Sequence, residues 1–556
     1  MAECFAGGRL LWYYSRMRTH NTLWAVVLAV AGSAVVGGLL GGRVLATPED
    51  VPQYYRVFAS AISAVEANYV EPIDTDRLVY GGIHGMLATL DPHSSFMDPK
   101  AYAQMRERQE GHYYGLGIQI VVNDGDITVS SIFEGSPAYQ KGLRTGYIIA
   151  RIEGEDARGW TSDQAVAKLR GARGTPVKIS IKRYGYDQFI DLEVVRDEIH
   201  IPSVPAAFML EAGTGYIRLQ DFSETTDREL GAALKDLTAK GMKRLLLDIR
   251  RNPGGPLDQA IRVANRFLPK GVMIVYTRGR IANSDQDYRA TEDSEYTELP
   301  LVVLTSRDSA SASEIVSGAL QDHDRGIIVG ETTFGKALVQ SVYRVSEGAG
   351  LALTTAHYFT PSGRMIQRPW DETFDEYLTY TLRDQKEREH SAADLKYTDS
   401  GRKVFSGGGV DPDHRLDGPV EGFNPGRLAR VLYTRGVFVG YAQRFTAAGD
   451  RRVSAESTNR KLVGTNFVVD TALVESFKQY ARTLAPKFEE AGFQADIDFI
   501  RAMIRFEIDR ALFGMSEARH HLLESDPQAK LAMSLFGEAD TLNRSARSRK
   551  TVVAAR

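Results

Sequence analysis

Apolar residues follow distinct patterns in the N-terminal part of this chain. From Asn21 to Gly42 no charged side chain interrupts a stretch that is long enough to cross a bilayer. From about residue 54 to residue 110, apolar residues recur at helical spacing. Residues 111–200 instead contain short runs that favour strands, with one helix that opens on the capping box of Thr161 and Gln164. These patterns predict a membrane segment, a helical arm and a small β domain.

Strands and helices alternate in residues 201–415. Apolar strands are predicted at 215–219, 244–249, 301–304 and 326–329, and helices at 227–239 and 257–267. Such alternation is typical of α/β folds in which helices cover a mostly parallel sheet. A further strand is predicted from Ala337 to Val345, and the strongly charged residues 370–402 indicate a solvated insertion.

The last part of the chain is predicted to be helical. Apolar residues lie on one helix face within residues 473–484 and within residues 497–508. These faces indicate packing against the preceding domain or against another copy of the chain, so a homo-oligomer formed through the helical regions stays open. We expect residues 416–540 to form a C-terminal helical region and the basic residues 541–556 to form a disordered tail.

The apolar segment, residues 21–46, predicts export or membrane attachment. Arg9, Arg16 and Arg18 precede it, and this bias places residues 1–20 in the cytoplasm. A signal peptide cut after Ala46 competes with an uncleaved signal anchor, which is favoured because the apolar run exceeds the roughly 7 to 15 residues of a signal peptide. We expect a single-pass protein of the inner membrane whose catalytic part lies on the periplasmic or extracytoplasmic side, beginning with a helical arm at 47–110.

Composition narrows the class of protein. A length of 556 residues with 43% hydrophobic content fits a multidomain enzyme with sizeable cores. The formal net charge of −3 gives no general attraction to nucleic acid. The single cysteine, Cys4, excludes intrachain disulfides. No metal or organic cofactor is expected, because His323 between Asp322 and Asp324 has no second histidine or cysteine at a ligand spacing.

The candidate chemistry lies between Ser309 and Gln340. Three serines, Ser309, Ser311 and Ser313, open a predicted helix, and Lys336 follows an apolar strand in a glycine turn. A serine hydroxyl needs a base within hydrogen-bond reach. A lysine can serve only when its pKa falls from about 10.4 to about 7, a cost of about 4 kcal/mol that burial can impose. If the two segments meet in space, the chain is a Ser-Lys hydrolase in which Gln340 orients the amine.

Less specific interpretations compete with this one. The serine run before Glu314 is typical of a helix N-cap, and a lysine in a glycine turn is usually solvated. Gly330 to Lys336 also matches the phosphate-binding loop of nucleotide hydrolases. Ala337, however, stands where Ser or Thr should hold Mg²⁺, and a strand rather than a helix follows. His93, between Asp91 and Ser94, is interpreted as part of a capped turn rather than as a catalytic residue.

A third motif, RNPGG at residues 251–255, follows an apolar strand and supplies a glycine turn whose amides can face an open site. With SASASE, FGKxxVQ and the upstream LDPHSS at 90–95, the chain closely resembles the carboxyl-terminal processing proteases, which are Ser-Lys endopeptidases. The resemblance implies an α/β, crotonase-like (Clp-protease-like) layered core. It also implies roles for five residues: Ser311 as nucleophile, Lys336 as general base, Gln340 as its orienting residue, and the N–H groups of Gly254 and Ala312 as oxyanion donors.

Residues 111–200 resemble a PDZ domain. The peptide-binding loop corresponds to Gly115, Leu116, Gly117 and Ile118, and Ser136-Pro137-Ala138 precedes a short helical turn. Such loops offer consecutive N–H groups to a terminal carboxylate while the peptide adds a strand to the sheet. A β-barrel with only a packing role is the alternative. Tyr147 stands where these modules usually carry aspartate, and Ala337 where the proteases usually carry glycine.

Together these motifs predict a serine endopeptidase. It would recognise C-terminal tails of exported proteins through the PDZ domain and cleave upstream peptide bonds, without nucleic acid as a partner. The alternative from another class is a catalytically inactive PDZ-type adaptor of the cell envelope, against which the intact Ser311, Lys336 and Gln340 argue.

Overall fold

The computed structural model describes residues 51–183, 188–345, 348–370, 377, 379–382, 390–447, 463–485 and 488–554. The expected cytoplasmic segment 1–20 and membrane segment 21–46 lie outside these residues. Within the described ranges no helix combines the length and apolar character needed to cross a membrane. The chain divides into two compact units, residues 1–86 and 87–556.

The first unit contributes the helical arm. Helix α2 spans Val51–Asn68 and helix α3 spans Thr75–Leu87, where the unit ends. Much of α2 is solvent-exposed, including Tyr54 and Tyr55. The sequence predicted helix as far as residue 110, and the second unit does contain helix α4, Pro99–Glu110. Between α3 and α4, however, Ser95–Met97 forms strand β1, because these residues pair with a strand more than 250 residues away.

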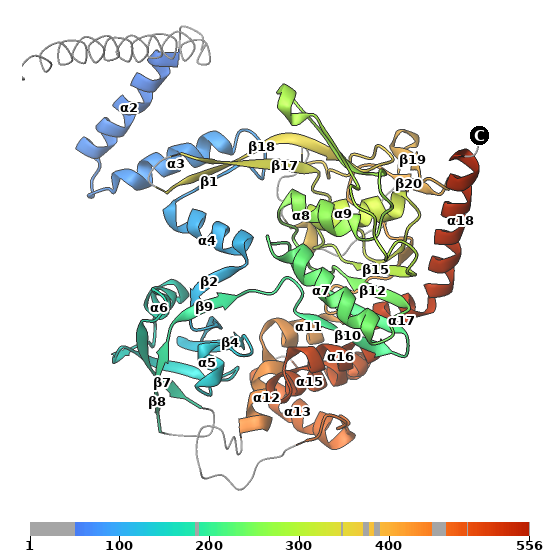
Figure 1. Ribbon diagram of the computed structural model, residues 1–556. Helices are drawn as coiled ribbons and strands as arrows, with labels where there is room; N and C mark the ends of the chain where they lie inside the picture. Colours follow the sequence, from blue (N-terminus) through green and yellow to red (C-terminus); the bar gives the residue numbers. More distant parts are fainter. Residues whose placement is uncertain are drawn as a thin grey trace, which may run out of the picture. The chain divides into compact units, whose positions relative to one another are not determined.

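A six-stranded sheet in the order β10-β11-β12-β15-β16-β21 forms the centre of the second unit (Figure 1). β10 is antiparallel to β11, and the other neighbours are parallel. The strand bounds are Ala206–Glu211, Thr214–Arg218, Arg244–Asp248, Leu301–Thr305, Ile327–Gly330 and His414–Arg415 in sheet order. Four of these strands were predicted from the apolar pattern.

Helices cover both faces of this sheet. On one face, Leu245, Leu247 and Val303 pack with residues of α7 (Thr226–Ala239), α8 (Leu257–Asn265) and α9 (Ala312–Asp322). On the other face, Leu246 and Val302 pack with residues of α16 (Met515–Ser525), α17 (Pro527–Ser534) and α18 (Phe536–Ala554) from the C-terminal region. Alternate residues of the same strands thus face opposite helical layers, which gives the layered α/β fold that was expected.

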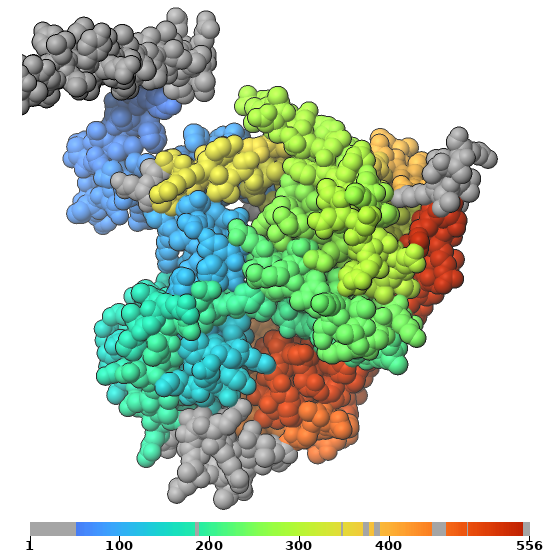
Figure 2. Space-filling model, in the orientation of Figure 1, coloured from blue at the N-terminus to red at the C-terminus, as the bar shows by residue number. Residues whose placement is uncertain are grey.

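The C-terminal region is an all-helical layer. Its aromatic core includes Phe438, Phe477 and Phe499, and Figure 2 shows the orange-red C-terminal residues lying against the green part of the core. The tail was predicted to be disordered from residue 541, whereas α18 continues to Ala554 and buries Asn543, which donates to the Thr297 carbonyl at 3.2 Å. The helices are α11 (Arg427–Thr434), α12 (Val437–Ala447), α13 (Thr471–Leu484), α14 (Glu490–Ala495), α15 (Ile497–Leu512), α16 (Met515–Ser525), α17 (Pro527–Ser534) and α18 (Phe536–Ala554).

A second sheet, in the order β1-β18-β13-β14 with β17 paired to β18, flanks the core. Its long strands are β13 (Met273–Gly279), β17 (Leu338–Arg344) and β18 (Gly350–Phe359), and β14 spans Gln286–Arg289. β17 is the strand predicted after Lys336. This sheet is important for the site because it joins β17 to the segment that precedes β1.

Residues 112–200 form the small β domain. β2 (His112–Gly115) pairs with β9 (Asp197–His200), and a separate sheet contains β3 (Ile118–Asn123), β4 (Asp126–Ile132), β5 (Ile148–Ile152), β6 (Glu155–Asp156), β7 (Pro176–Lys182) and β8 (Ile190–Val195). Helix α6 (Ser162–Leu169) opens on the predicted capping box, and α5 (Pro137–Gln140) opens on Ser136. Tyr147, the residue that departs from the expected aspartate, is buried in this domain's core.

Candidate active site

Ser311 occupies the N-cap of α9 with an unusual backbone. Its φ is 53° and its ψ is −111°, in a region that L-residues with a side chain rarely adopt. Such a conformation costs on the order of 1–3 kcal/mol and persists only where the surroundings impose it. Hydrogen bonds to Ser311 from Glu314 N, Ile315 N and Tyr358 Oη, at 2.8, 3.0 and 3.2 Å, all reach its carbonyl and hold this turn.

The two neighbouring serines have structural tasks. Ser309 is fully buried, and its hydroxyl donates to the Ile249 carbonyl at 2.8 Å. Ser313 is also fully buried, and its hydroxyl donates to the Asn252 carbonyl at 3.0 Å. Ser311, by contrast, is only partly buried. Both structural serines attach the beginning of α9 and the residues before it to the chain that follows β12, Ser309 at Ile249 and Ser313 at Asn252 of the RNPGG motif.

Lys336 lies in the loop between β16 and β17, and its Nζ donates to Gln340 Oε1 at 2.8 Å. A β-bulge between Val339 and Gln340 interrupts the pairing of β17 with β18. Bulges bend a strand and redirect its side chains. Gln340 Nε2 in turn donates to the His93 carbonyl at 2.7 Å, so the segment before β1 fixes the amide that contacts the lysine.

Glu314 connects the two predicted catalytic residues through their backbones. Its Oε2 accepts hydrogen bonds from Ser311 N at 2.8 Å and from Lys336 N at 2.9 Å. Its Oε1 accepts from Gly335 N at 2.7 Å and from Thr333 Oγ1 at 2.5 Å. One fully buried carboxylate thus brings the N-terminus of α9 and the lysine loop together.

Burial dominates the electrostatics of this cluster. It lowers the pKa of Lys336 from its ordinary value, although the charges of Glu314 and Asp91 act in the opposite direction. Burial, followed by the charge of Lys336, lowers the pKa of His93 to about 4. Burial raises the pKa of Glu314 to about 7, against the effect of its four hydrogen-bond donors. Burial therefore disfavours the charged form of both the amine and the imidazole.

The RNPGG turn lies directly against Ser311. Gly254 has φ 93°, and a Cβ at this position would lie 2.8 Å from Ser311 Cβ and 2.9 Å from Ala312 N. The predicted oxyanion donors therefore both lie beside the serine. The Gly254 N–H donates to Asn252 Oδ1 at 2.9 Å, and the buried Asn252 side chain donates to the Leu219 carbonyl at 2.9 Å.

The predicted peptide-binding loop borders a groove in the β domain. Gly115 ends β2, Leu116 is buried, and Gly117 has φ 79°. A Cβ on Gly117 would lie 2.2 Å from Ser136 Cβ, so only glycine fits. A groove of about 260 Å³ lies between β3, which begins at Ile118, and α6. Its lining is Tyr113, Leu116, Ile118, Gln119, Ile120, Ser162, Val166, Leu169 and Arg170.

Comparisons with known proteins assign this arrangement to a family. Residues 213–371 match Peptidase family S41, residues 104–182 match the PDZ domain, and residues 47–101 match the activating protease CtpB N-terminal domain. The carboxy-terminal-processing protease of Bartonella bacilliformis is 40% identical over 349 residues, which cover 62% of this chain and 80% of the relative. The chain belongs to the carboxyl-terminal processing proteases.

A second relative by sequence agrees with this assignment. The carboxy-terminal processing protease CtpA of Bacillus subtilis is 35% identical over 361 residues, which cover 63% of this chain and 76% of the relative. Among solved structures, the photosystem II D1 C-terminal processing protease is 28% identical, with a TM-score of 0.35 over 65% of this chain and 92% of the other. The protein is a serine-type peptidase that carries a PDZ domain and acts on protein or peptide substrates.

Sequence reasoning missed several residues that build the protease's site. Glu314 was named only as the residue after the serine run and was given no role. His93 was assigned only to a capped turn, which Asp91 does form by accepting from His93 N and Ser94 N at 2.8 Å. The sequence pattern could not predict these contacts, because the residues that Glu314 and His93 contact lie far away along the chain. Only the occurrence of His93 in the LDPHSS motif linked it to the other catalytic segments.

The predicted solvated insertion, residues 370–402, is solvated only in places within its described part, where Leu382 and Tyr397 are exposed. Tyr377 is buried; it bonds through its hydroxyl with His93 Nε2, and its ring packs edge-on against Phe334. Arg402 donates to Asp324 at 2.6 Å, which ties the other end of the segment to the core. The charged composition suggested solvation throughout, but aromatic and arginine contacts attach parts of the segment to the protease.

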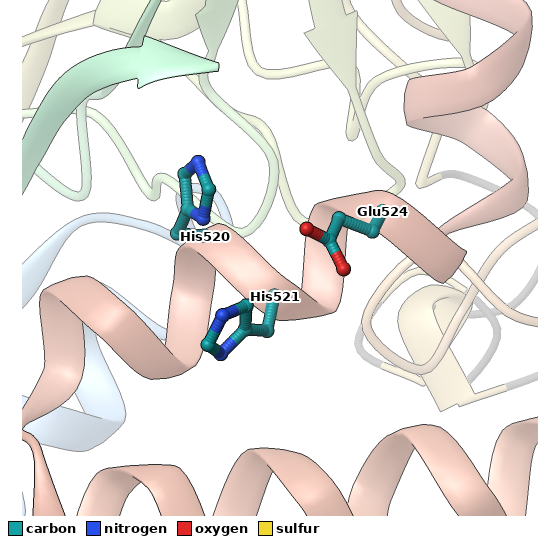
Figure 3. Close-up of side chains that lie close together, drawn as sticks. All are labelled: His520, His521 and Glu524. Carbon is teal, nitrogen blue, oxygen red and sulfur yellow. The ribbon is translucent and has the colours of Figure 1, made fainter. Parts of the chain in front are cut away.

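One group of possible metal ligands lies outside this site. His520, His521 and Glu524 on α16 have ligand atoms within 4.8 Å of one another. Figure 3 shows, however, that the two imidazoles point to different sides of the helix. His521 Nδ1 is 2.8 Å from Asp509 Oδ2, and its Nε2 is 3.4 Å from a Glu517 oxygen. These contacts explain the group as part of the packing of α15 against α16.

Proposed function

We propose that the protein is a Ser-Lys endopeptidase in which Ser311 is the nucleophile, Lys336 is the general base and Gln340 orients the lysine. The observation that carries this proposal is the junction at Glu314. One oxygen of this carboxylate, Oε2, accepts hydrogen bonds from the backbone N–H groups of both Ser311 and Lys336. The lysine's lowered pKa and its hydrogen bond to Gln340 support the base assignment. The commitment of Ser309 and Ser313 to backbone carbonyls supports the choice of Ser311.

The proposed reaction has two halves. Ser311 Oγ attacks the carbonyl carbon of the scissile bond and transfers its proton to Lys336 Nζ, while the N–H groups of Ala312 and Gly254 receive the developing oxyanion. The C–N bond then breaks, and the leaving amine takes the proton from Lys336. Water attacks the acyl ester with Lys336 again as base, which releases the new C-terminal carboxylate and restores Ser311. For Gly254 this role requires its N–H to be released from, or shared with, Asn252 Oδ1.

For the substrate we propose an exported protein whose free C-terminus enters the groove between β3 and α6. The loop at 115–118 and the apolar residues Ile120, Val166 and Leu169 support this assignment, because they combine backbone donors with pockets for side chains. The charge pattern around the apolar segment 21–46 supports a single-pass position in the inner membrane, with the protease on the extracytoplasmic side.

Cleavage of a peptide with a free C-terminus by the full-length protein tests the dyad. We expect Ser311→Ala and Lys336→Ala to lower kcat/KM by about 10⁴-fold or more, because the residues act as one unit. A matched control is Ser548→Ala, which removes an exposed serine hydroxyl that donates only to the Arg544 carbonyl within α18, at 3.0 Å. Amidation of the substrate's C-terminus should raise KM. Undiminished cleavage by Lys336→Ala would exclude lysine as the base.

A further inference from the structure

The proposed oxyanion donor Gly254 lies in a turn, residues 250–255, that we call the oxyanion turn. The first two residues of this turn are arginines that contact the C-terminal helical region. Arg250 and Arg251 lie between β12 and Asn252, so their side chains fix the chain immediately before the predicted donor Gly254. Arg250 is buried beside Asp248, and its Nη2 lies 2.7 Å from Asp248 Oδ2. Arg218 Nη1 lies 2.7 Å from the other carboxylate oxygen, Asp248 Oδ1. Burial alone would raise the pKa of Asp248, but these two arginines hold it well below its usual range. The core alone thus satisfies only part of the Arg250 guanidinium.

The remaining part of Arg250 contacts the start of α17. Its Nη1 donates to Asp526 Oδ2 at 2.7 Å and to Gln528 Oε1 at 2.9 Å. Asp526 is itself fixed as the N-cap of α17, because its Oδ1 accepts from the N–H groups of Gln528 and Ala529. A buried charge pair of this kind gives directional bonds with little freedom of position. Helix α17 therefore shares with Asp248 in fixing the position of Arg250.

Arg251 makes a second connection. It has φ 56°, a strained value for a residue with a side chain, and its Nη1 lies 3.3 Å from Glu421 Oε1. The other oxygen of Glu421 accepts from Arg519 on α16 at 2.7 Å. Burial alone would raise the pKa of Glu421. Arg519 and Arg251 nevertheless hold this pKa below its usual range, so the carboxylate is ionised. The C-terminal region therefore contacts two successive residues of the turn.

We propose, on the basis of the Ser-Lys function above, that Asp526 and Glu421 are positioning residues for the oxyanion turn. The turn is attached to the nucleophile helix by Asn252, whose carbonyl accepts from Ala310 N and from Ser313 Oγ, both at 3.0 Å. A shift of Arg250 or Arg251 is thus transmitted to Gly254 and to the start of α9. Oxyanion donors act only within a narrow range of distance from the developing charge. The C-terminal helices, beyond covering the sheet, hold part of the catalytic geometry.

Asp526→Asn isolates this effect in the full-length protein. Asparagine is as good an N-cap as aspartate, so the helix end is kept while the negative charge that pairs with Arg250 is removed. Glu421→Gln is the second variant, at the other arginine. Glu538→Gln is the matched control, because Glu538 joins the C-terminal region to His414 of β21, 3.1 Å away, without contacting the turn.

We expect both test variants to lower kcat about 10-fold to 100-fold with KM changed less than twofold, since one weakened oxyanion donor costs up to about 10²–10³ in kcat. Affinity for a peptide aldehyde, whose adduct places an oxyanion in the same position, should fall in parallel. Glu538→Gln should change neither quantity. Unchanged kcat and aldehyde affinity in folded Asp526→Asn overturn the proposal, and if that variant does not fold, the same results in Glu421→Gln decide it.

Failure of this inference is distinct from failure of the Ser-Lys assignment. If Ser311→Ala cleaves as well as the wild type, the proposed function is wrong whatever the test variants do. If Ser311→Ala is inactive and both carboxylate variants retain full kcat, only the positioning role is wrong. A rise in KM alone would assign the two carboxylates to general folding or to substrate binding, which also contradicts the proposal.

Discussion

Among single residues, Glu314 connects the candidate nucleophile with the candidate base. A capping box explains only its bond to Ser311 N. The other three donors, Thr333, Gly335 and Lys336, belong to a segment that follows it by 19 to 22 residues. The sequence S-x-x-E is the same whether or not such distant donors exist, and for this reason the motif predicted the cap but not the junction.

The resemblance to a family was required to select Ser311, and the structure adds a physical reason for this choice. All three serines have the same local sequence environment of small residues. They differ in what their hydroxyls contact, and this depends on strand β12 and on the RNPGG turn, both more than 50 residues away. Lys336 and Gln340 lie in the same short sequence motif. The spacing of residues in that motif did not predict, however, that the His93 carbonyl fixes Gln340.

The charge of Glu314 gives a prediction about pH. Because Lys336 must lose its proton to act as base, kcat/KM should rise with pH through the lysine's lowered pKa, below the ordinary lysine range. An ionised Glu314 raises that pKa, so Glu314→Gln should move the rise to lower pH. The plateau should also fall by about 10-fold, since an amide leaves backbone donors unsatisfied at a cost of about 1–3 kcal/mol.

The pH dependence of kcat/KM for wild type and Glu314→Gln, measured over the pH range in which both remain folded, checks this prediction. Glu538→Gln again serves as the control, because it removes a carboxylate far from Lys336. A rise that moves to higher pH in Glu314→Gln would contradict the assigned electrostatics, and a rise at the ordinary lysine pKa in the wild type would contradict the buried amine.

Among the elements, the strands of the central sheet followed the apolar pattern most closely. β12, β15 and β16 are buried on both faces, so each appears in the sequence as a continuous apolar run. β1 and α18 were missed because neither appears in the sequence as a clear apolar pattern. β1 has only three residues and depends on its pairing with β18, and α18 has a basic, mostly polar sequence that is held by contacts to the core such as Asn543 with Thr297.

The oxyanion turn permits a test of backbone geometry at the level of one element. Gly254→Ala should abolish most activity, because alanine at φ 93° is strained and its Cβ would lie 2.7 Å from the Ala310 carbonyl oxygen. Gly271 has a similar φ of 88°, but no atom lies within 4 Å of a Cβ there. Gly271→Ala therefore carries only the strain, about 1–2 kcal/mol.

Both variants should lose stability in denaturant titrations, and Gly254→Ala should lose more. Only Gly254→Ala should also lose kcat, by at least about 100-fold, since the turn must move away from Ser311 and Ala312. Equal losses of stability with full activity in both variants would mean that the turn can relax without affecting the nucleophile.

For the catalytic unit as a whole, residues 87–556, the sheet has one helical layer from the protease segment and another from the C-terminal region. Ala529, Ala532 and Phe536 pack on Leu246 and Val302 in the second layer. The pattern of residues 416–540 predicted packing faces but left open whether they meet the core or another subunit. The faces predicted within residues 473–484 and 497–508 pack in the C-terminal region's own core. It is α17 and α18 that place apolar residues on the sheet.

If the C-terminal helices complete the protease core, removing one buried ring from them should destabilise the core itself. Phe536→Ala is expected to cost about 3–5 kcal/mol in the free energy of unfolding, as for other large-to-small changes at buried aromatic sites. Phe189→Ala, at a side chain that is 46% exposed in the PDZ domain, provides the matched control and should cost less than about 1 kcal/mol.

The measurement is guanidinium unfolding followed both by circular dichroism and by loss of peptidase activity. Both signals should shift together to lower denaturant in Phe536→Ala, because α18 and the catalytic sheet share one hydrophobic core. A separate early transition that leaves peptidase activity unchanged would show instead that the C-terminal region unfolds independently of the site.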